Sequence, residues 1–118
     1  MDLNTEAQID ILIEKFYAKV SVHEILGPFF KETNWEYHVP RIRAFWYFIL
    51  LDKPGFKGNI YDAHANRQIK KVHFDIWVEI FCTVIDEHYQ GEVAEKAKNK
   101  AKELALLFSW KLTEKEGA

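Results

Sequence analysis

The stretch IDILIEKFYAKV, residues 9–20, decides the fold class of this chain. Its apolar residues recur at i, i+3, i+4, i+7, i+8 and i+11, which is the spacing of one helix face. These residues are Ile9, Leu12, Ile13, Phe16, Tyr17 and Val20. Thr5 and Gln8 precede the stretch and match the capping-box pattern Thr-x-x-Gln. The sequence therefore predicts a helix with one apolar face, and Tyr17 lies on that face.

A short second helix is expected directly after the first. Ser21 and Glu24 repeat the start signal as Ser-x-x-Glu, and the pair Gly27-Pro28 is typical of a helix end. A loop is expected next, around residues 31–35.

A second clean apolar stripe predicts a long helix in the middle of the chain. Its members are Ile42, Phe45, Trp46, Ile49 and Leu50. His38 lies four residues before Ile42, so it extends the same face toward the helix start. Pro40 suits a first helical turn and disfavours helical geometry at Val39. We therefore expect this helix to begin near Val39, with His38 just outside it.

A connector separates this helix from the second half of the chain. Pro54-Gly55 and Gly58 predict a loop over residues 52–59. The following residues up to Lys71 show weak periodicity, which leaves His64 on either a loop or a short helix.

Two long helices are expected to complete the fold. The first has the apolar stripe Phe74, Trp77, Phe81, Val84, Ile85 and His88, and Gln90-Gly91 ends it. The second runs from Glu92 to Leu112 and turns inward Val93, Ala97, Ala101, Leu104, Ala105 and Phe108. Because no useful stretch alternates like a strand, the sequence predicts an all-α chain.

Composition narrows the class of protein. A length of 118 residues predicts one domain, residues 1–118, with a single core. The aromatic content of 15% suits a bulky core or a protein that wraps a flat apolar cofactor. The net charge of −2 argues against a nucleic-acid binder, which shows a basic stripe. The single cysteine, Cys82, excludes an internal disulfide and a cysteine-based zinc site.

Targeting and catalytic motifs are missing from the sequence. Residues 1–6 lack a basic start and an apolar signal core. The longest apolar run, Phe45 to Leu51, is far shorter than the ~18–20 residues of a membrane span. We find no nucleophile elbow, phosphate-binding glycine loop or His-Glu-x-x-His motif. A cytoplasmic monomer without membrane contact or hydrolytic chemistry is expected.

Short motifs along the chain resemble those of the truncated haemoglobins, and most closely group III of that family. In the family's order they are Phe16-Tyr17-Ala18-Lys19-Val20, Leu26-Gly27-Pro28-Phe29-Phe30, Trp35-x-x-His38, Phe45-Trp46, His64 and His73-Phe74-Asp75-Ile76-Trp77. Each match alone is weak, but together they are specific and cover roughly Ile9 to Phe108. The resemblance implies a two-over-two helical sandwich that holds haem b.

His64 matches the family's proximal histidine, which binds the haem iron. Neutral imidazole is a good ligand for haem iron. Its other ring nitrogen is expected to donate to a backbone carbonyl, which selects the tautomer. Without the surrounding motifs, His64 would be read as an ordinary surface residue.

Three residues match the distal, gas-binding side of the family's haem. Tyr17 matches the distal tyrosine, whose O–H donates a charge-assisted hydrogen bond to bound dioxygen. Trp77 matches a tryptophan over the distal side, and its indole N–H is a donor only. His38 matches the distal histidine, with three roles open: it hydrogen-bonds the ligand, gates its entry or binds iron as a sixth ligand. The alternative is an exposed histidine at a helix start.

Four more positions are expected to contact the haem. Phe30 matches the phenylalanine on the haem face and Ile42 matches a distal wall residue, although both also suit a plain core. Phe45, from the motif Phe45-Trp46, is a further expected haem contact. Arg41 matches a basic position near the haem propionates.

The chain departs from the family at three places. Pro40 stands at a helix-compatible position, the loop between Phe30 and Trp35 is short, and Ala63 replaces a basic residue before the proximal histidine. Arg67, Lys70 and Lys71 are candidate replacements for that basic residue.

Three functions remain open from the sequence. The first is a haem protein that binds dioxygen, nitric oxide or carbon monoxide. The second is a haem enzyme for nitric oxide detoxification or peroxidase chemistry, supplied with electrons by a reductase. Cys82 falls within an expected helix rather than the proximal connector, so it does not suggest a thiolate ligand. The third is a haem-free helical interaction module.

Overall fold

Helices account for every regular element in the described part of the chain. The computed structural model describes residues 1–30, 35–54 and 70–117. Its elements are α1 (Glu6–Ser21), the 3₁₀ helix η1 (Gly27–Phe30), α2 (Trp35–Leu51), α4 (Lys71–His88) and α5 (Glu92–Gly117). The predicted all-α class is confirmed.

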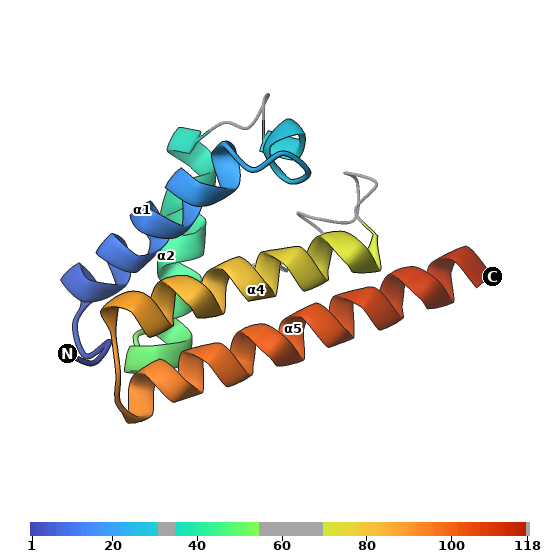
Figure 1. Ribbon diagram of the computed structural model, residues 1–118. Helices are drawn as coiled ribbons and strands as arrows, with labels where there is room; N and C mark the ends of the chain where they lie inside the picture. The colour runs from blue at the N-terminus through green and yellow to red at the C-terminus, as the bar shows by residue number, and fades with distance from the viewer. Residues whose placement is uncertain (31–34, 55–69, 118) are drawn as a thin grey trace.

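The four long helices form two pairs, one lying across the other (Figure 1). A short turn joins α4 to α5, and these two helices run side by side in opposite directions. In the other pair α1 packs on α2, and the pairs meet where α1 contacts α4 and α2 contacts α5. This arrangement is the predicted two-over-two helical sandwich. Within the described ranges, none of these helices combines the length and apolar content that a membrane crossing needs.

The predicted start and face of α1 are both confirmed. The backbone N–H of Gln8 donates to the Thr5 side chain at 3.2 Å, and the Gln8 side chain accepts from the Thr5 N–H at 3.1 Å. This reciprocal pair is a capping box. Behind it, every residue of the predicted stripe is buried except Tyr17, which is half-buried.

The short helix predicted after α1 is wrong. Helix α1 runs through Ser21, and the chain then turns into η1. The His23 Nδ1 atom accepts from two backbone N–H groups, two and three residues further on, at 3.1 and 3.3 Å. A Cβ atom on Gly27 would lie 2.8 Å from the Ser21 carbonyl oxygen. Gly27 is therefore needed for the close approach of η1 to the end of α1, not as the end of another helix.

The predicted start of α2 near Val39 is also wrong, because the helix spans Trp35–Leu51 and includes Pro40. Pro40 stands early in the helix, so its missing N–H removes only the backbone bond to the Glu36 carbonyl. The consequence is that His38 lies inside the helix. Trp35 and His38, three residues apart, therefore share one face.

Helices α4 and α5 follow the predicted stripes except at His88, which is exposed. Phe74, Phe81, Val84 and Ile85 of α4 are buried, and Trp77 is half-buried. On α5, small buried residues at Ala97, Ala101 and Ala105 face the sandwich, so its backbone lies close to its neighbours. The last helix extends beyond the predicted Leu112.

The first residues of the chain cap the start of α5. The Asp2 carboxylate accepts hydrogen bonds from the backbone N–H groups of Val93 at 3.0 Å and Ala94 at 2.7 Å. Gly91 has a φ of 135°, and a Cβ atom there would lie 2.3 Å from Asp2 Oδ2. Burial acts to raise the pKa of Asp2, but backbone hydrogen bonds from Val93, Leu3 and Ala94 hold it below its ordinary value of 3.8. Gly91, which precedes α5, has no side chain to accept these N–H groups, so Asp2 caps the helix in its place.

Replacing Asp2 with alanine is expected to lower the free energy of unfolding by about 1 kcal/mol, the usual cost of losing a helix N-cap. Since the folded pKa of Asp2 is depressed, this contribution is present above the unfolded pKa and is lost as pH falls through the folded value. Urea denaturation at pH 7 and at pH 3 measures both effects. Asp2→Asn keeps an acceptor without the charge, and an Asp2→Ala variant of unchanged stability at pH 7 would contradict the cap.

Candidate functional site

An aromatic cluster gathers where α1, η1 and α2 meet. It consists of Tyr17, Phe30, Trp35 and His38, and we call it the α1–α2 cluster. Tyr17 is at its centre, with ring centroids 5.9 Å from Phe30, 5.2 Å from Trp35 and 5.4 Å from His38. Phe30 and Trp35 stack at 5.7 Å with an angle of 17° between their planes. The cluster exists because α2 begins early enough to place Trp35 and His38 against α1.

Tyr17 and His38 are joined by a hydrogen bond inside this cluster. The Tyr17 hydroxyl lies 2.9 Å from His38 Nε2, and both side chains are half-buried. A phenol donates or accepts, and a neutral imidazole does either at Nε2 according to its tautomer. The pair therefore places two adaptable polar groups in a wall of aromatic rings.

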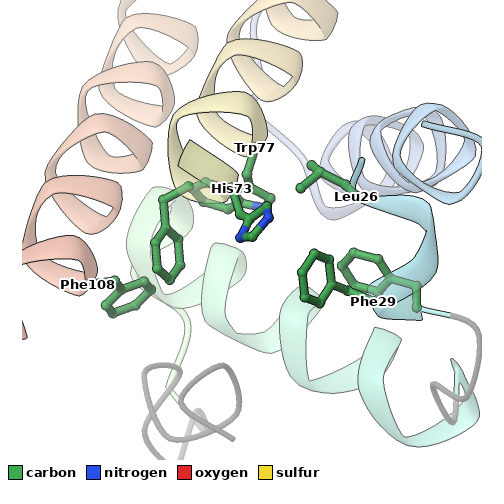
Figure 2. Close-up of a pocket in the computed structure, with 7 residues that line it drawn as sticks. Leu26, Phe29, His73, Trp77 and Phe108 are labelled. Atoms are coloured by element: carbon green, nitrogen blue, oxygen red, sulfur yellow. The ribbon is translucent and has the colours of Figure 1, made fainter. Parts of the chain in front are cut away.

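A pocket lies beside the cluster, between η1, α4 and α5 (Figure 2), and we call it the aromatic pocket. It is lined by Leu26, Phe29, Phe30, His73, Phe74, Trp77 and Phe108. Figure 2 shows Leu26 and Phe29 on one side and Phe108 on the other, with His73 and Trp77 from α4 between them. Phe30 belongs to both the pocket and the α1–α2 cluster. Aromatic rings thus make up all of the described lining except Leu26.

His73 is held in one orientation at this pocket. Its Nδ1 atom accepts from the backbone N–H of Lys70 at 2.8 Å, and its ring meets Phe29 edge-on at 4.6 Å. Burial, followed by the charge of Lys70, lowers the pKa of His73 below its ordinary value of 6.5. The ring is therefore neutral at pH 7.

A second, inner cavity lies deeper in the sandwich. It is lined by Ile13, Phe16, Tyr17, Ile42, Phe45, Trp46, Trp77, Phe81, Leu104 and Phe108. Trp77 borders both the inner cavity and the aromatic pocket. Its ring stacks on Phe81 at 5.8 Å and meets Phe16 edge-on at 5.9 Å. The Trp77 side chain therefore lines both the aromatic pocket and the inner cavity.

The structure brings most of the predicted site residues together. Tyr17, Phe30 and His38 meet in the α1–α2 cluster, and Tyr17 also borders the inner cavity. Ile42 and Phe45 line that cavity, as Trp77 does.

Arg41 stands apart from these residues. Its Nη1 atom donates to the Tyr37 hydroxyl at 3.0 Å, and its guanidinium lies 5.0 Å from the centre of the Tyr37 ring. His64, together with Ala63 and Arg67, lies outside the described residues. Lys71, another candidate basic residue, forms an exposed ion pair with Asp75 at 2.9 Å.

Several pocket residues were not among the predicted site residues. They are Leu26, Phe29, His73, Phe74 and Phe108. Phe29 is the neighbour of Phe30 in the motif Gly-Pro-Phe-Phe, and Phe74 and Phe108 lie on apolar stripes. Four of them, Leu26, Phe29, His73 and Phe74, belong to the quoted family motifs, but those motifs assigned them no contact with a pocket. An apolar stripe such as that of Phe108 identifies a buried face but does not distinguish a packed core from the wall of a pocket.

The chain is similar to truncated haemoglobins in both sequence and fold. It is 27% identical over 104 residues to the group 3 truncated haemoglobin ctb of Campylobacter jejuni, covering 82% of each chain. It is 27% identical over 86 residues to a group 1 truncated haemoglobin of Tetrahymena thermophila, covering 72% of this chain and 71% of that one. The crystal structure of the group III truncated haemoglobin from Campylobacter jejuni superposes with a TM-score of 0.82 at 26% identity, covering 95% of both chains. No family model matches.

Proposed function

Since this chain is a truncated globin of the group III type, we propose that it holds haem b and binds dioxygen or another diatomic gas at the haem iron. Nitric oxide and carbon monoxide are the other gases of this class. The observation that carries the proposal is the hydrogen-bonded pair of Tyr17 and His38 set beside an apolar aromatic pocket. The pocket suits a flat apolar cofactor, and the pair suits a small polar ligand next to it.

The described residues fit the haem in their chemistry. Phe29, Phe30 and Trp77 offer flat faces and edges to a planar ring system, and Phe74 and Phe108 close the pocket from the α4–α5 side. An apolar lining of this kind gains free energy when it covers a hydrophobic cofactor, since apolar surface leaves water. Phe45 and Ile42 support the wall from the inner cavity.

Ferrous haem supplies the iron at which a diatomic gas binds. On the gas-binding side of the haem, the protein would offer hydrogen-bond donors and exclude water. Tyr17 offers a phenolic O–H, and His38 orients that hydroxyl through their 2.9 Å contact. Trp77 contributes an indole N–H, which is a donor only. Tyr17 and Trp77 are the proposed donors to the gas, and His38 completes the distal site by donating from Nε2–H to the Tyr17 oxygen.

The proposed iron ligand is His64, and the support for it is the resemblance to the family's proximal histidine. Among the described residues, His23 and His73 use Nδ1 to accept backbone N–H groups. His38 bonds Tyr17, and the His88 side chain is 39% exposed beside Glu87. These four described histidines each have a contact of their own, whereas His64 lies outside the described residues.

Arg41 is proposed to reach a haem carboxylate by leaving Tyr37. The Tyr37 ring is 63% exposed, and a cation–π contact at an exposed site is worth only about 0.5–1 kcal/mol. A charge-assisted bond to a carboxylate is stronger than that contact. Arg41 is therefore available to a bound haem at small cost.

Titration with haem tests the proposal directly. We expect one equivalent of haem to give a strong Soret band, with further spectral changes when the ferrous protein meets dioxygen or carbon monoxide. A titration that leaves the spectrum of free haem unchanged would instead support the haem-free helical module.

A haem enzyme is the second candidate, favoured by the polar pair of Tyr17 and His38. Donors next to the iron also stabilise charge during nitric oxide detoxification or peroxidase turnover. Slow dioxygen release together with turnover in the presence of an electron-donating reductase would favour the enzyme. Fast and reversible release would favour a carrier or sensor.

A further inference from the structure

We propose that His73 holds the bound haem by donating a hydrogen bond from Nε2–H to one of the haem carboxylates. This inference rests on the proposed haem binding, and it adds a residue that the motifs alone assign only to the helix. It follows from the tautomer of His73, from its place in the aromatic pocket and from the charge beside it.

The tautomer follows from the contact with Lys70. The backbone N–H of Lys70 donates to His73 Nδ1 at 2.8 Å, so Nδ1 carries a lone pair rather than a proton. In a neutral imidazole the proton then resides on Nε2. Burial and the neighbouring charge of Lys70 favour this neutral form. His73 therefore presents an N–H donor, and it has no free lone pair with which to bind iron.

The His73 ring that carries this donor lines the aromatic pocket. His73 is half-buried, and its ring lies between the Phe108 side and the Phe29 side of the aromatic pocket (Figure 2). Of the other described lining residues, only Trp77 carries a polar side-chain atom. An acceptor on a molecule that enters the pocket is thus the natural partner of Nε2–H.

The acceptor of this hydrogen bond is expected to be a negatively charged group and not the bound gas. The Lys70 charge acts on His73, so the site favours a negative group. Tyr17 and His38 pair with each other in the α1–α2 cluster, which shares Phe30 with the pocket. The haem carboxylates are the anionic groups on the proposed cofactor, so we assign one of them to His73.

Two variants of His73 and two haems test this assignment. His73→Phe keeps a ring against Phe29 but removes the donor. His73→Gln keeps a donor, and glutamine at this helix position also accepts the Lys70 N–H as in a capping box. Each is loaded with haem or with haem dimethyl ester, whose carboxylates are uncharged. The measured quantity is the rate of haem transfer to excess apomyoglobin, and His88→Phe is the control at an exposed histidine of the same helix.

We expect His73→Phe to lose haem about tenfold faster than the unmodified protein, because a charge-assisted hydrogen bond is lost. His73→Gln and His88→Phe are expected to match the unmodified protein. With the dimethyl ester, His73→Phe is expected to lose its disadvantage. Equal acceleration for both haems would overturn the assignment, because a damaged helix cap affects them alike. So would an unchanged rate in His73→Phe. An unmodified protein that takes up no haem would instead refute the proposed function itself.

Discussion

Replacing His64 with alanine is expected to abolish the native coordination of the haem iron. A methyl group offers no lone pair, whereas neutral imidazole is a good axial ligand. We do not expect His23, His38 or His73 to replace it, since His23 and His73 accept backbone N–H groups at Nδ1 and His38 is bonded to Tyr17. The visible spectra of the ferric, ferrous and carbon monoxide forms measure the change.

Two controls make this result specific to His64. His88→Ala removes an exposed histidine and is expected to leave all three spectra unchanged. Added imidazole is expected to restore a histidine-like spectrum to His64→Ala, because it fills the space that the side chain left. If the spectra of His64→Ala equal those of the unmodified protein, His64 is not the iron ligand.

Replacing Tyr17 with phenylalanine is expected to speed dioxygen release about ten- to a hundredfold. Dioxygen on ferrous haem takes on negative charge, and a hydrogen bond to a charged group is worth about 1.5–3 kcal/mol. Phenylalanine keeps the ring contacts with Phe30 and Trp35 and removes only the hydroxyl that lies 2.9 Å from His38. Stopped-flow displacement of dioxygen by carbon monoxide gives the release rate.

A second tyrosine offers a matched control for this prediction. Tyr89 is buried, and its hydroxyl donates to the Gln8 carbonyl at 3.0 Å, far from the α1–α2 cluster. Tyr89→Phe is expected to lower the free energy of unfolding by about 1 kcal/mol without changing dioxygen release. A release rate in Tyr17→Phe equal to that of Tyr89→Phe would remove Tyr17 from the distal donors.

The helices were predictable wherever their signals are local. The stripe that begins at Ile9 and the capping box of Thr5 and Gln8 depend on residues a few positions apart, and the structure confirms both. The two failures have different causes. Gly27 ends no helix, because the close approach to Ser21 requires it, and Pro40 sits inside α2.

The candidate site was predicted only as a set of residue types in a family order. The motifs named Tyr17, His38 and Trp77, but no spacing in the sequence predicts that Tyr17 and His38 share a hydrogen bond across 21 positions. The same is true of Phe29 and Phe108, which line one pocket from separate elements. Apolar periodicity shows which face is covered but not what covers it.

By itself the sequence determined the all-α class, the buried faces of the long helices and the residues chemically suited to a haem site, because propensity, caps and side-chain chemistry are local properties. Only the tertiary structure decided which of these side chains meet. The crossing of α1 and α2 brings Tyr17 to His38, and the packing of α4 and α5 opens a pocket at His73. The same packing allows Asp2 to cap a helix that begins 90 residues later. Such contacts depend on the relative placement of whole helices, which no short stretch of the chain specifies.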